Sequence, residues 1–225
     1  MKISYLVTCH NETVELDKVL GQLHAHISNN NLEDEIVVLD DFSVNPNTKA
    51  ILEKYRTKGV SIIQHALNGD FSEHKNYGSK RCIGEMIVQL DADEYLSQTL
   101  LENMHELLES NPKVELYRVP RVNIVRGMTP EDAIKWGWKV YSLPEFPNLP
   151  IINWEFDHQS RIYKNSLKIQ WKKKLHETVM GALYTTLLPL EVDYAIIHDK
   201  TIDRQRAQNE FYNKNWSTEA NMGKG

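Results

Sequence analysis

Three carboxylates, Asp91, Asp93 and Glu94, follow a short apolar run in this chain. The run, Met86 to Leu90, has the length and composition of a buried strand, which would deliver the carboxylates to the edge of a sheet. Alternation along a strand places Asp91 and Asp93 on the same side, about 6–7 Å apart. Like charges this close repel unless a cation joins them, and Mg²⁺ or Mn²⁺ takes carboxylates together with substrate phosphates. The stretch predicts a metal–diphosphate site, with a solvated acidic turn or helix cap as the alternative.

The first half of the chain supplies elements that would position these carboxylates. Continuous apolar runs predict strands over residues 2–8, 36–39, 60–63 and 86–90, and helical spacing predicts helices over 16–27, 46–55, 72–84 and 100–108. This alternation is typical of a parallel sheet covered by helices on both faces, which binds ligands at the carboxyl ends of its strands. Three of the four strands end there in polar clusters, at residues 8–12, 40–41 and 91–94. A nucleotide lying across all three clusters is the predicted ligand.

The second half has a different character. Strands are predicted over residues 114–125, 159–164, 167–171 and 192–197, followed by a polar helix over 201–216 and a frayed tail. Four of the eight prolines and three of the five tryptophans lie within residues 130–154. Such a long aromatic segment is interpreted either as an acceptor-binding segment or lid, or as a packed structural excursion.

Composition limits the class of protein. The 225 residues are 41% hydrophobic and 25% charged, which is ordinary for a soluble domain, and no apolar run approaches the roughly 18–20 residues of a membrane helix. The only cysteines, Cys9 and Cys82, are expected to be free thiols in a reducing compartment, so a cytoplasmic location is predicted. The net charge of −5 gives no overall attraction to nucleic acid or anionic lipid, although residues 172–174 are three consecutive lysines.

The order of the polar clusters resembles family 2 glycosyltransferases of the GT-A fold. The matching segments are residues 3–12, 35–43 and 90–94, while 75–81 and 157–164, followed by His176-Glu177, are similar to the branch that modifies lipopolysaccharide cores. The resemblance implies an α/β, Rossmann-like, mostly parallel sheet sandwiched by helices, with a smaller mixed acceptor-side region. We therefore expect a single domain, residues 1–225. It would have a nucleotide-sugar-binding half (1–112), an acceptor-side half (113–200) and a C-terminal helix and tail (201–225).

The resemblance also implies roles for individual residues. The fold's activity is sugar transfer from a nucleoside diphosphate donor, here expected to be a UDP-sugar, and the family generally inverts the anomeric centre. Thr8 and Asp41 match positions that hold the base, and Asp91 would face the ribose or reach the metal through water. Asp93 would coordinate Mn²⁺ or Mg²⁺, and His198 would complete the metal site. The remaining nucleotide-sugar-binding candidates are His10, Glu12 and Asp40 near the ribose, and Lys75, Lys80, Arg161, Lys164 and His176 near the phosphates.

Inversion needs a base that takes the acceptor proton within hydrogen-bond reach. Glu177 is the first candidate because the His-Glu pair falls where the family builds its acceptor side, and Asp157 is the second. Phe42 departs from the pattern, since it replaces the glycine usual after the paired acids.

Two alternative functions remain open. A sugar nucleotidyltransferase would need a glycine-rich loop after the first strand, and residues 8–12 contain no glycine. A non-catalytic nucleotide-sugar-binding module would not need the three converging acidic clusters. For the leading interpretation the acceptor is a hydroxyl of a glycan or lipopolysaccharide core, or of a hydroxylated DNA base, and the protein is expected to be soluble or peripheral to a membrane.

Overall fold

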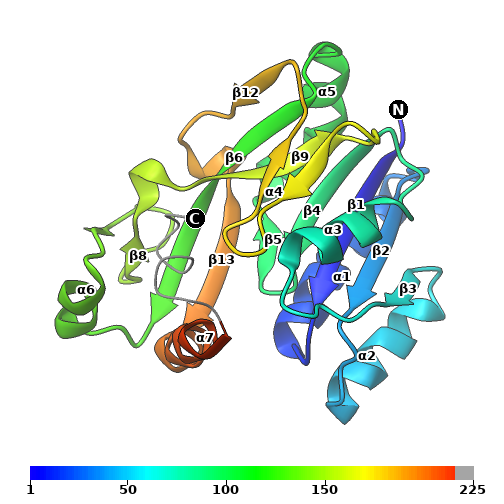
Figure 1. Ribbon diagram of the computed structural model, residues 1–225. Coiled ribbons are helices and arrows are strands. Elements are labelled where there is room, and N and C mark those ends of the chain that lie inside the picture. The colour runs from blue at the N-terminus through cyan, green and yellow to red at the C-terminus, as the bar shows by residue number, and fades with distance from the viewer. Residues whose placement is uncertain (216–225) are drawn as a thin grey trace.

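Eight strands form the continuous path of a mixed sheet in the order β3-β2-β1-β4-β9-β6-β13-β5 (Figure 1). This computed structural model describes residues 1–215. The first four strands run parallel and are β1 (Ile3–Cys9), β2 (Glu35–Asp40), β3 (Ser61–Gln64) and β4 (Met86–Asp91). They confirm the strands predicted from the apolar runs of the first half.

The other half of the sheet mixes directions. β9 (His158–Lys164) lies antiparallel between β4 and β6 (Leu116–Arg126), and β13 (Ile196–Thr201) runs parallel to β6 and antiparallel to β5 (Glu94–Leu96). β12 (Thr185–Leu187) and β8 (Ile151–Ile152) also pair with β6, and β7 (Val140–Tyr141) pairs with β8. β10 (Gln170–Lys172) and β11 (Thr178–Met180) form a separate hairpin. The mixed region is larger than the sequence indicated, because β9 inserts between strands that are distant in sequence.

Helices cover both faces of the parallel part. α1 (Val14–Asn29) buries Leu16 and Leu20 in the core that contains Tyr5 and Val7, while the opposite face carries Leu6. α3 (Phe71–Ser79) lies close on that opposite face: a Cβ at Gly78 would be 2.8 Å from Leu6 Cδ1, so a larger residue would push the helix away. The other helices are α2 (Pro46–Arg56), α4 (Gln98–Glu102), α5 (Met104–Ser110), α6 (Pro130–Trp136) and α7 (Ile202–Asn215), with short 3₁₀ turns at Trp154–Phe156 and Val192–Tyr194.

Several element boundaries differ from the predicted ones. The helix expected over 100–108 is split into α4 and α5 at Asn103, whose side chain donates to the carbonyl of Thr99 at 2.8 Å and so competes with the backbone. The helix expected to reach residue 84 ends at Ser79, and Gly84 instead passes against Ser4, where a Cβ would be 2.6 Å from the backbone nitrogen.

The second half shows similar shifts in boundary. The strand expected over 167–171 is only Gln170–Lys172. The one expected over 192–197 begins at Ile196 and continues through polar residues to Thr201, because β6 pairs with it as far as Arg126. The segment 130–154 holds α6, β7, β8 and the start of a 3₁₀ turn. Residue 216 of the predicted C-terminal helix and the tail to 225 lie outside the described residues.

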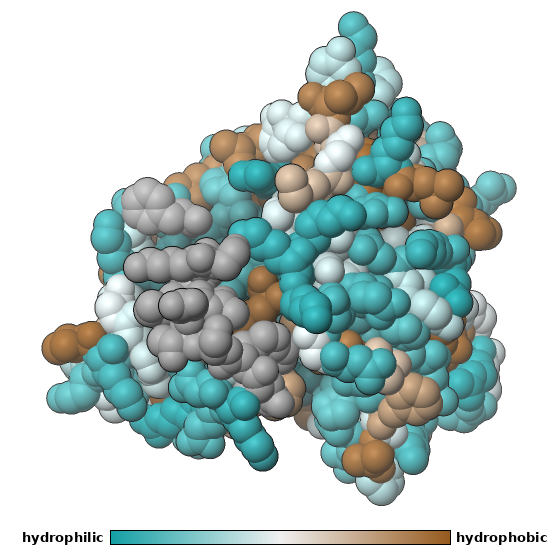
Figure 2. Space-filling view, viewed as in Figure 1, coloured by the Kyte–Doolittle hydropathy of each residue, from teal (hydrophilic) through white to brown (hydrophobic). Residues whose placement is uncertain are grey.

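The surface seen in Figure 2 is mainly hydrophilic, and its apolar residues lie in separate spots. Within residues 1–215, no helix combines the length and apolar character needed to cross a membrane. Cys9 and Cys82 are buried free thiols, as expected.

Candidate active site at the carboxyl edge of the sheet

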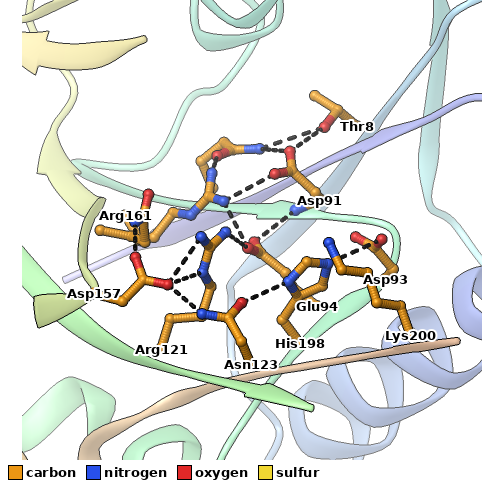
Figure 3. Close-up of polar contacts among 12 residues, drawn as sticks. Thr8, Asp91, Asp93, Glu94, Arg121, Asn123, Asp157, Arg161, His198 and Lys200 are labelled. Carbon is orange, nitrogen blue, oxygen red and sulfur yellow. Dashed lines mark hydrogen bonds and ion pairs between the residues drawn. The ribbon is translucent and has the colours of Figure 1, made fainter. Parts of the chain in front are cut away.

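The ends of β1 and β4 bring Thr8 and Asp91 together. The two residues are partners in the register of these parallel strands, and the Thr8 hydroxyl donates to Asp91 Oδ1 at 2.8 Å (Figure 3). Gln89 Nε2 donates to the same carboxylate oxygen at 3.0 Å. This places two predicted nucleotide-binding residues side by side at the edge where α/β sheets bind ligands.

Asp93 lies in the turn that follows β4, so the alternation expected of a strand does not reach it. β4 ends at Asp91, and β5 begins at Glu94. Asp93 Oδ2 is 3.2 Å from His198 Nε2 and 3.4 Å from Arg204 Nη2, neither of which contacts Asp91. The two carboxylates of the D-x-D pair therefore have separate partners (Figure 3).

Both carboxylates are held in the charged form. Burial raises the pKa of Asp91, but Arg161 and Lys75 outweigh burial and keep it well below the usual range. Burial also raises the pKa of Asp93, but the contact with His198 and the nearby Arg204 together outweigh burial and lower the pKa. At neutral pH the edge therefore presents two anions with oxygen atoms suited to a hard cation.

Asp93 and His198 fit one side of a metal site. Among the residues that the structure describes, no three His, Cys, Asp or Glu side chains are grouped to hold an ion, so this pair would need further ligands from a bound substrate and water. Asp93 Oδ2 and His198 Nε2 lie 3.2 Å apart, at hydrogen-bond distance, and an ion bound there would take one oxygen and one nitrogen ligand from this pair. Arg204 also faces Asp93, but it has two other carboxylate partners.

A network of buried charges lies beneath this edge. Arg161, only 3% exposed, donates from Nη2 to Asp91 Oδ2 at 2.8 Å and to Glu94 Oε1 at 2.7 Å. Arg121 Nη1 donates to the same Glu94 oxygen at 3.2 Å, and its Nη2 lies 3.0 Å from Asp157 Oδ2. Because Arg161 already neutralises two carboxylates, it orients Asp91 rather than standing free for a phosphate.

Lys75 lies in α3 and Lys80 directly follows this helix, and of these two predicted phosphate ligands only Lys75 reaches the site. Lys75 is 2% exposed; its Nζ is 2.7 Å from Glu177 Oε1, 3.1 Å from Asp91 Oδ1 and 4.7 Å from the centre of the Trp171 ring. Lys80 is exposed beyond the end of α3, and Lys164 is exposed opposite Met86, at the start of β4. Lys80 and Lys164 therefore lie toward the other edge of the sheet.

The two candidate bases differ in their surroundings. Burial raises the pKa of Glu177, but Lys75 outweighs it and the net pKa is lowered, so the side chain is ionised at neutral pH. Burial raises the pKa of Asp157 as well, but Arg121 and the hydrogen bonds that Asn123 and Gln159 donate together outweigh burial and lower the pKa. Asp157 is thus fully occupied by partners, whereas Glu177 is paired with Lys75 at 2.7 Å. His176, next to Glu177, is exposed with a φ of 52°.

The loops after β1 and β2 form the side of the edge that is predicted to hold the base. His10 Nδ1 lies 2.7 Å from the carbonyl of Asp41, whose Oδ1 accepts from the backbone N–H of Leu67 at 2.9 Å. Asp40 is 1% exposed and accepts from the N–H of Ser43, so it shapes the loop and does not line the edge. Phe42, 53% exposed, has a φ of 46°, a conformation that glycine adopts without strain.

Arg204, from α7, was not among the predicted site residues. Its guanidinium lies 2.8 Å from Glu12, 3.1 Å from Glu15 and 3.4 Å from Asp93. Two hollows, of about 250 and 340 Å³, share Arg204 and Glu15 in their walls. One reaches Asp93 and the other reaches His10, so Arg204 separates the predicted metal side from the predicted base side.

Sequence reasoning missed three residues of the site, which are Arg121, Asn123 and Arg204, and gave Glu94 no role of its own. Arg121 and Asn123 interrupt the apolar run of β6, so polar residues within a predicted buried strand were a usable signal. No local pattern marks Arg204, because its role depends on where α7 lies relative to β1 and β4.

Comparison with known proteins gives a consistent result. Residues 4–177 match the family model described as "Glycosyl transferase family 2". A stretch of 118 residues is 24% identical to an "Uncharacterized glycosyltransferase" of Haemophilus influenzae, covering 52% of this chain and 38% of that protein. A stretch of 126 residues is 30% identical to the poly(ribitol-phosphate) beta-N-acetylglucosaminyltransferase TarS of Staphylococcus aureus, covering 55% of this chain and 22% of TarS. The chain thus matches less than half the length of these relatives.

Solved structures show the same fold. The structure of S. aureus TarS 1–349 aligns with a TM-score of 0.59 at 18% identity, over 88% of this chain and 60% of the other. The same protein in complex with UDP-GlcNAc aligns with a TM-score of 0.56 at 20% identity, over 89% and 59%.

Proposed function

Because the chain belongs to glycosyl transferase family 2, is a glycosyltransferase and has a GT-A-like fold, we propose that it transfers a sugar from a UDP-sugar to a hydroxyl group, with inversion and with a divalent ion. One observation carries this proposal. Thr8 with Asp91, and Asp93 with His198, converge on the carboxyl edge of the sheet as two contacting pairs. TarS, a protein of similar fold, has been solved in complex with UDP-GlcNAc, and this supports a uridine nucleotide as the donor.

In this proposal the donor lies along the edge with its base toward Asp41 and its diphosphate toward Asp93. Thr8 helps Asp41 to hold the base, and Asp91 faces the ribose and stays ionised because Arg161 and Lys75 face it. Asp93 and His198 hold Mn²⁺ or Mg²⁺, and the nitrogen ligand favours Mn²⁺. When bound, such an ion would neutralise charge on the departing diphosphate.

Glu177 is the proposed general base. An ionised carboxylate can accept the proton of an acceptor hydroxyl, and the net lowered pKa of Glu177 keeps it ionised at neutral pH. The ammonium group of Lys75 forms ion pairs with both Glu177 and Asp91. It thereby fixes the position of the proposed base, Glu177, relative to Asp91. Asp157 is the weaker candidate, since Arg121, Asn123 and Gln159 take up its oxygens.

The acceptor is proposed to be a hydroxyl of a glycan. TarS acts on poly(ribitol-phosphate), and the sequence resembles the branch that modifies lipopolysaccharide cores, so a polyhydroxylated polymer is the shared class. A hydroxylated DNA base is less favoured, because the net charge of −5 opposes binding to nucleic acid. The family match favours sugar transfer over nucleotidyl transfer.

Calorimetry with UDP and Mn²⁺ tests the donor site. We expect wild-type protein to bind UDP more tightly with Mn²⁺ than with EDTA, and Asp93→Ala to lose that difference while keeping metal-free binding. Equal Mn²⁺ dependence in both proteins would exclude Asp93 as a ligand. A screen of UDP-sugars for donor hydrolysis then identifies the sugar, and no hydrolysis of any nucleotide-sugar would argue against transfer.

A further inference from the structure

Arg204 contacts three carboxyl groups that come from three separate elements. Its guanidinium lies 2.8 Å from Glu12 in the loop after β1, 3.1 Å from Glu15 in α1 and 3.4 Å from Asp93 in the turn after β4. The side chain of Arg204 is nevertheless 32% exposed. One guanidinium therefore serves three carboxyl groups and still faces solvent.

The position of Arg204 divides the edge of the sheet. Both hollows of the edge have Arg204 in their walls, and one of them reaches Asp93 while the other reaches His10. The helix that carries Arg204, α7, directly follows β13 (Figure 1). Near its other end the ring of Tyr212 lies 6.4 Å from that of Phe71, the first residue of α3. A nucleotide diphosphate that extends from the His10 side to Asp93 therefore has to pass the guanidinium of Arg204.

Arg204 also differs from the cations beneath the edge. Arg161 and Lys75 are 3% and 2% exposed, and both pair with Asp91. Moving either of them would break a buried ion pair, which is costly. Arg204 can leave one carboxyl group and keep another, because it has three partners and a partly exposed side chain.

We propose that Arg204 exchanges partners when the donor binds: its guanidinium leaves Asp93 and binds the diphosphate. The inference rests on the proposed function, because the diphosphate belongs to the donor. The guanidinium lies 3.4 Å from Asp93 Oδ2, the oxygen that also faces His198, so it would be repelled by a cation held there. Its planar fork of N–H donors matches phosphate oxygens, and the contact with Glu12 at 2.8 Å keeps it at the edge.

Calorimetry with UDP, inorganic pyrophosphate and uridine in the presence of Mn²⁺ tests the exchange. We expect Arg204→Ala to bind UDP and pyrophosphate about 10–100-fold more weakly than wild-type protein, because charge-assisted hydrogen bonds to phosphate are lost. Uridine has no phosphate and should bind equally to both proteins. Arg204→Lys keeps the charge without the fork and should give an intermediate loss.

The matched control is Arg206→Ala, which removes an arginine from the same helix. Arg206 pairs with Asp132 at 3.0 Å, so this variant should bind all three ligands as wild type does. If Arg206→Ala loses as much UDP affinity as Arg204→Ala, the effect comes from the helix and the inference is overturned.

A second comparison, with EDTA in place of Mn²⁺, separates an exchange of partners from a fixed contact. Without an ion the guanidinium should stay on Asp93, so Arg204→Ala should then lose less affinity for UDP than it does with Mn²⁺. An equal loss under both conditions would overturn the exchange.

The same measurements distinguish this inference from the proposed donor. If wild type and Arg204→Ala bind UDP equally with Mn²⁺, the inference fails and the uridine donor stands. If wild type binds pyrophosphate as tightly as UDP, and Arg204→Ala loses this binding, the uridine nucleotide is wrong and the role of Arg204 stands.

Discussion

Replacing Glu94 by glutamine should destabilise this protein far more than an ordinary surface substitution. Glu94 is 1% exposed at the start of β5 and is the carboxylate that Arg161 and Arg121 share, at 2.7 and 3.2 Å. It also accepts from the backbone N–H of Asp91 at 3.1 Å. Glu94→Gln keeps the shape of the side chain but removes its charge. The guanidinium groups of Arg161 and Arg121 then lose the carboxylate that they share.

The magnitude follows from the cost of a buried charge without its partner. Breaking a buried ion pair by removing one member costs about 3–5 kcal/mol. For a protein of this size, 1 kcal/mol corresponds to a shift in Tm of roughly 2–4 °C, so the variant should unfold about 6–20 °C lower. Arg161 keeps Asp91, and Arg121 keeps Asp157, which favours the lower part of this range.

Differential scanning calorimetry and urea unfolding at neutral pH provide the test. The matched control is Glu53→Gln, which removes another glutamate paired with an arginine, Arg56, but on the surface, with 59% of the Glu53 side chain exposed. An exposed pair contributes about 0–1 kcal/mol, so the control should unfold within a few degrees of wild type. If Glu94→Gln loses no more stability than Glu53→Gln, the buried network does not stabilise the fold and the reasoning fails.

Three further predictions concern the edge of the sheet. Glu177→Gln should bind UDP as wild type does but lose sugar transfer by roughly 10²–10⁴-fold, and retained turnover would exclude Glu177 as the base. Arg204→Ala should raise the affinity for Mn²⁺ by up to about fivefold (~1 kcal/mol) in calorimetry without nucleotide, because a cation 3.4 Å from Asp93 is removed; weaker binding would contradict this. The pKa of Asp157 is lower in the folded protein than in the unfolded chain, where it is about 3.9. The ionised carboxylate therefore stabilises the folded state at pH values above about 3.9, and this stabilisation is lost as the pH falls through the pKa of the folded protein. In urea unfolding at pH 6 and pH 3, Asp157→Asn should therefore lose less stability than wild type on acidification, and an equal loss would refute the contribution.

The parallel part of the fold was predictable because its information is local. Each of β1 to β4 is a continuous apolar run, and a polar cluster follows β1, β2 and β4, so topology rules alone place these clusters at one edge. The family resemblance, and not topology, led to His198 as a partner of Asp93, and the structure brings the two side chains to 3.2 Å. Boundaries were less predictable, as at Asn103, where the predicted helix is divided into α4 and α5.

The contacts that fix the site depend on pairing between distant segments. Arg161 reaches Glu94 only because β9 inserts antiparallel beside β4, and no pattern within residues 158–164 indicates that position. Arg204 reaches Asp93 from a helix more than a hundred residues later in the chain. For the same reason Lys80 and Lys164 were plausible phosphate ligands by type, but the direction of α3 and β9 carries them toward the opposite edge.

The turn after β4 explains why the two carboxylates of the D-x-D pair have different partners. If the strand continued, Asp91 and Asp93 would face the same partners and repel each other. Because β4 ends at Asp91, the chain turns, and each carboxylate meets its own partners: Arg161 and Lys75 for Asp91, His198 for Asp93. Glu94 begins the next strand, and its side chain closes the turn by accepting from the backbone N–H of Asp91. The same side chain pairs with both Arg161 and Arg121. Glu94 thus stabilises the turn that gives Asp91 and Asp93 different partners.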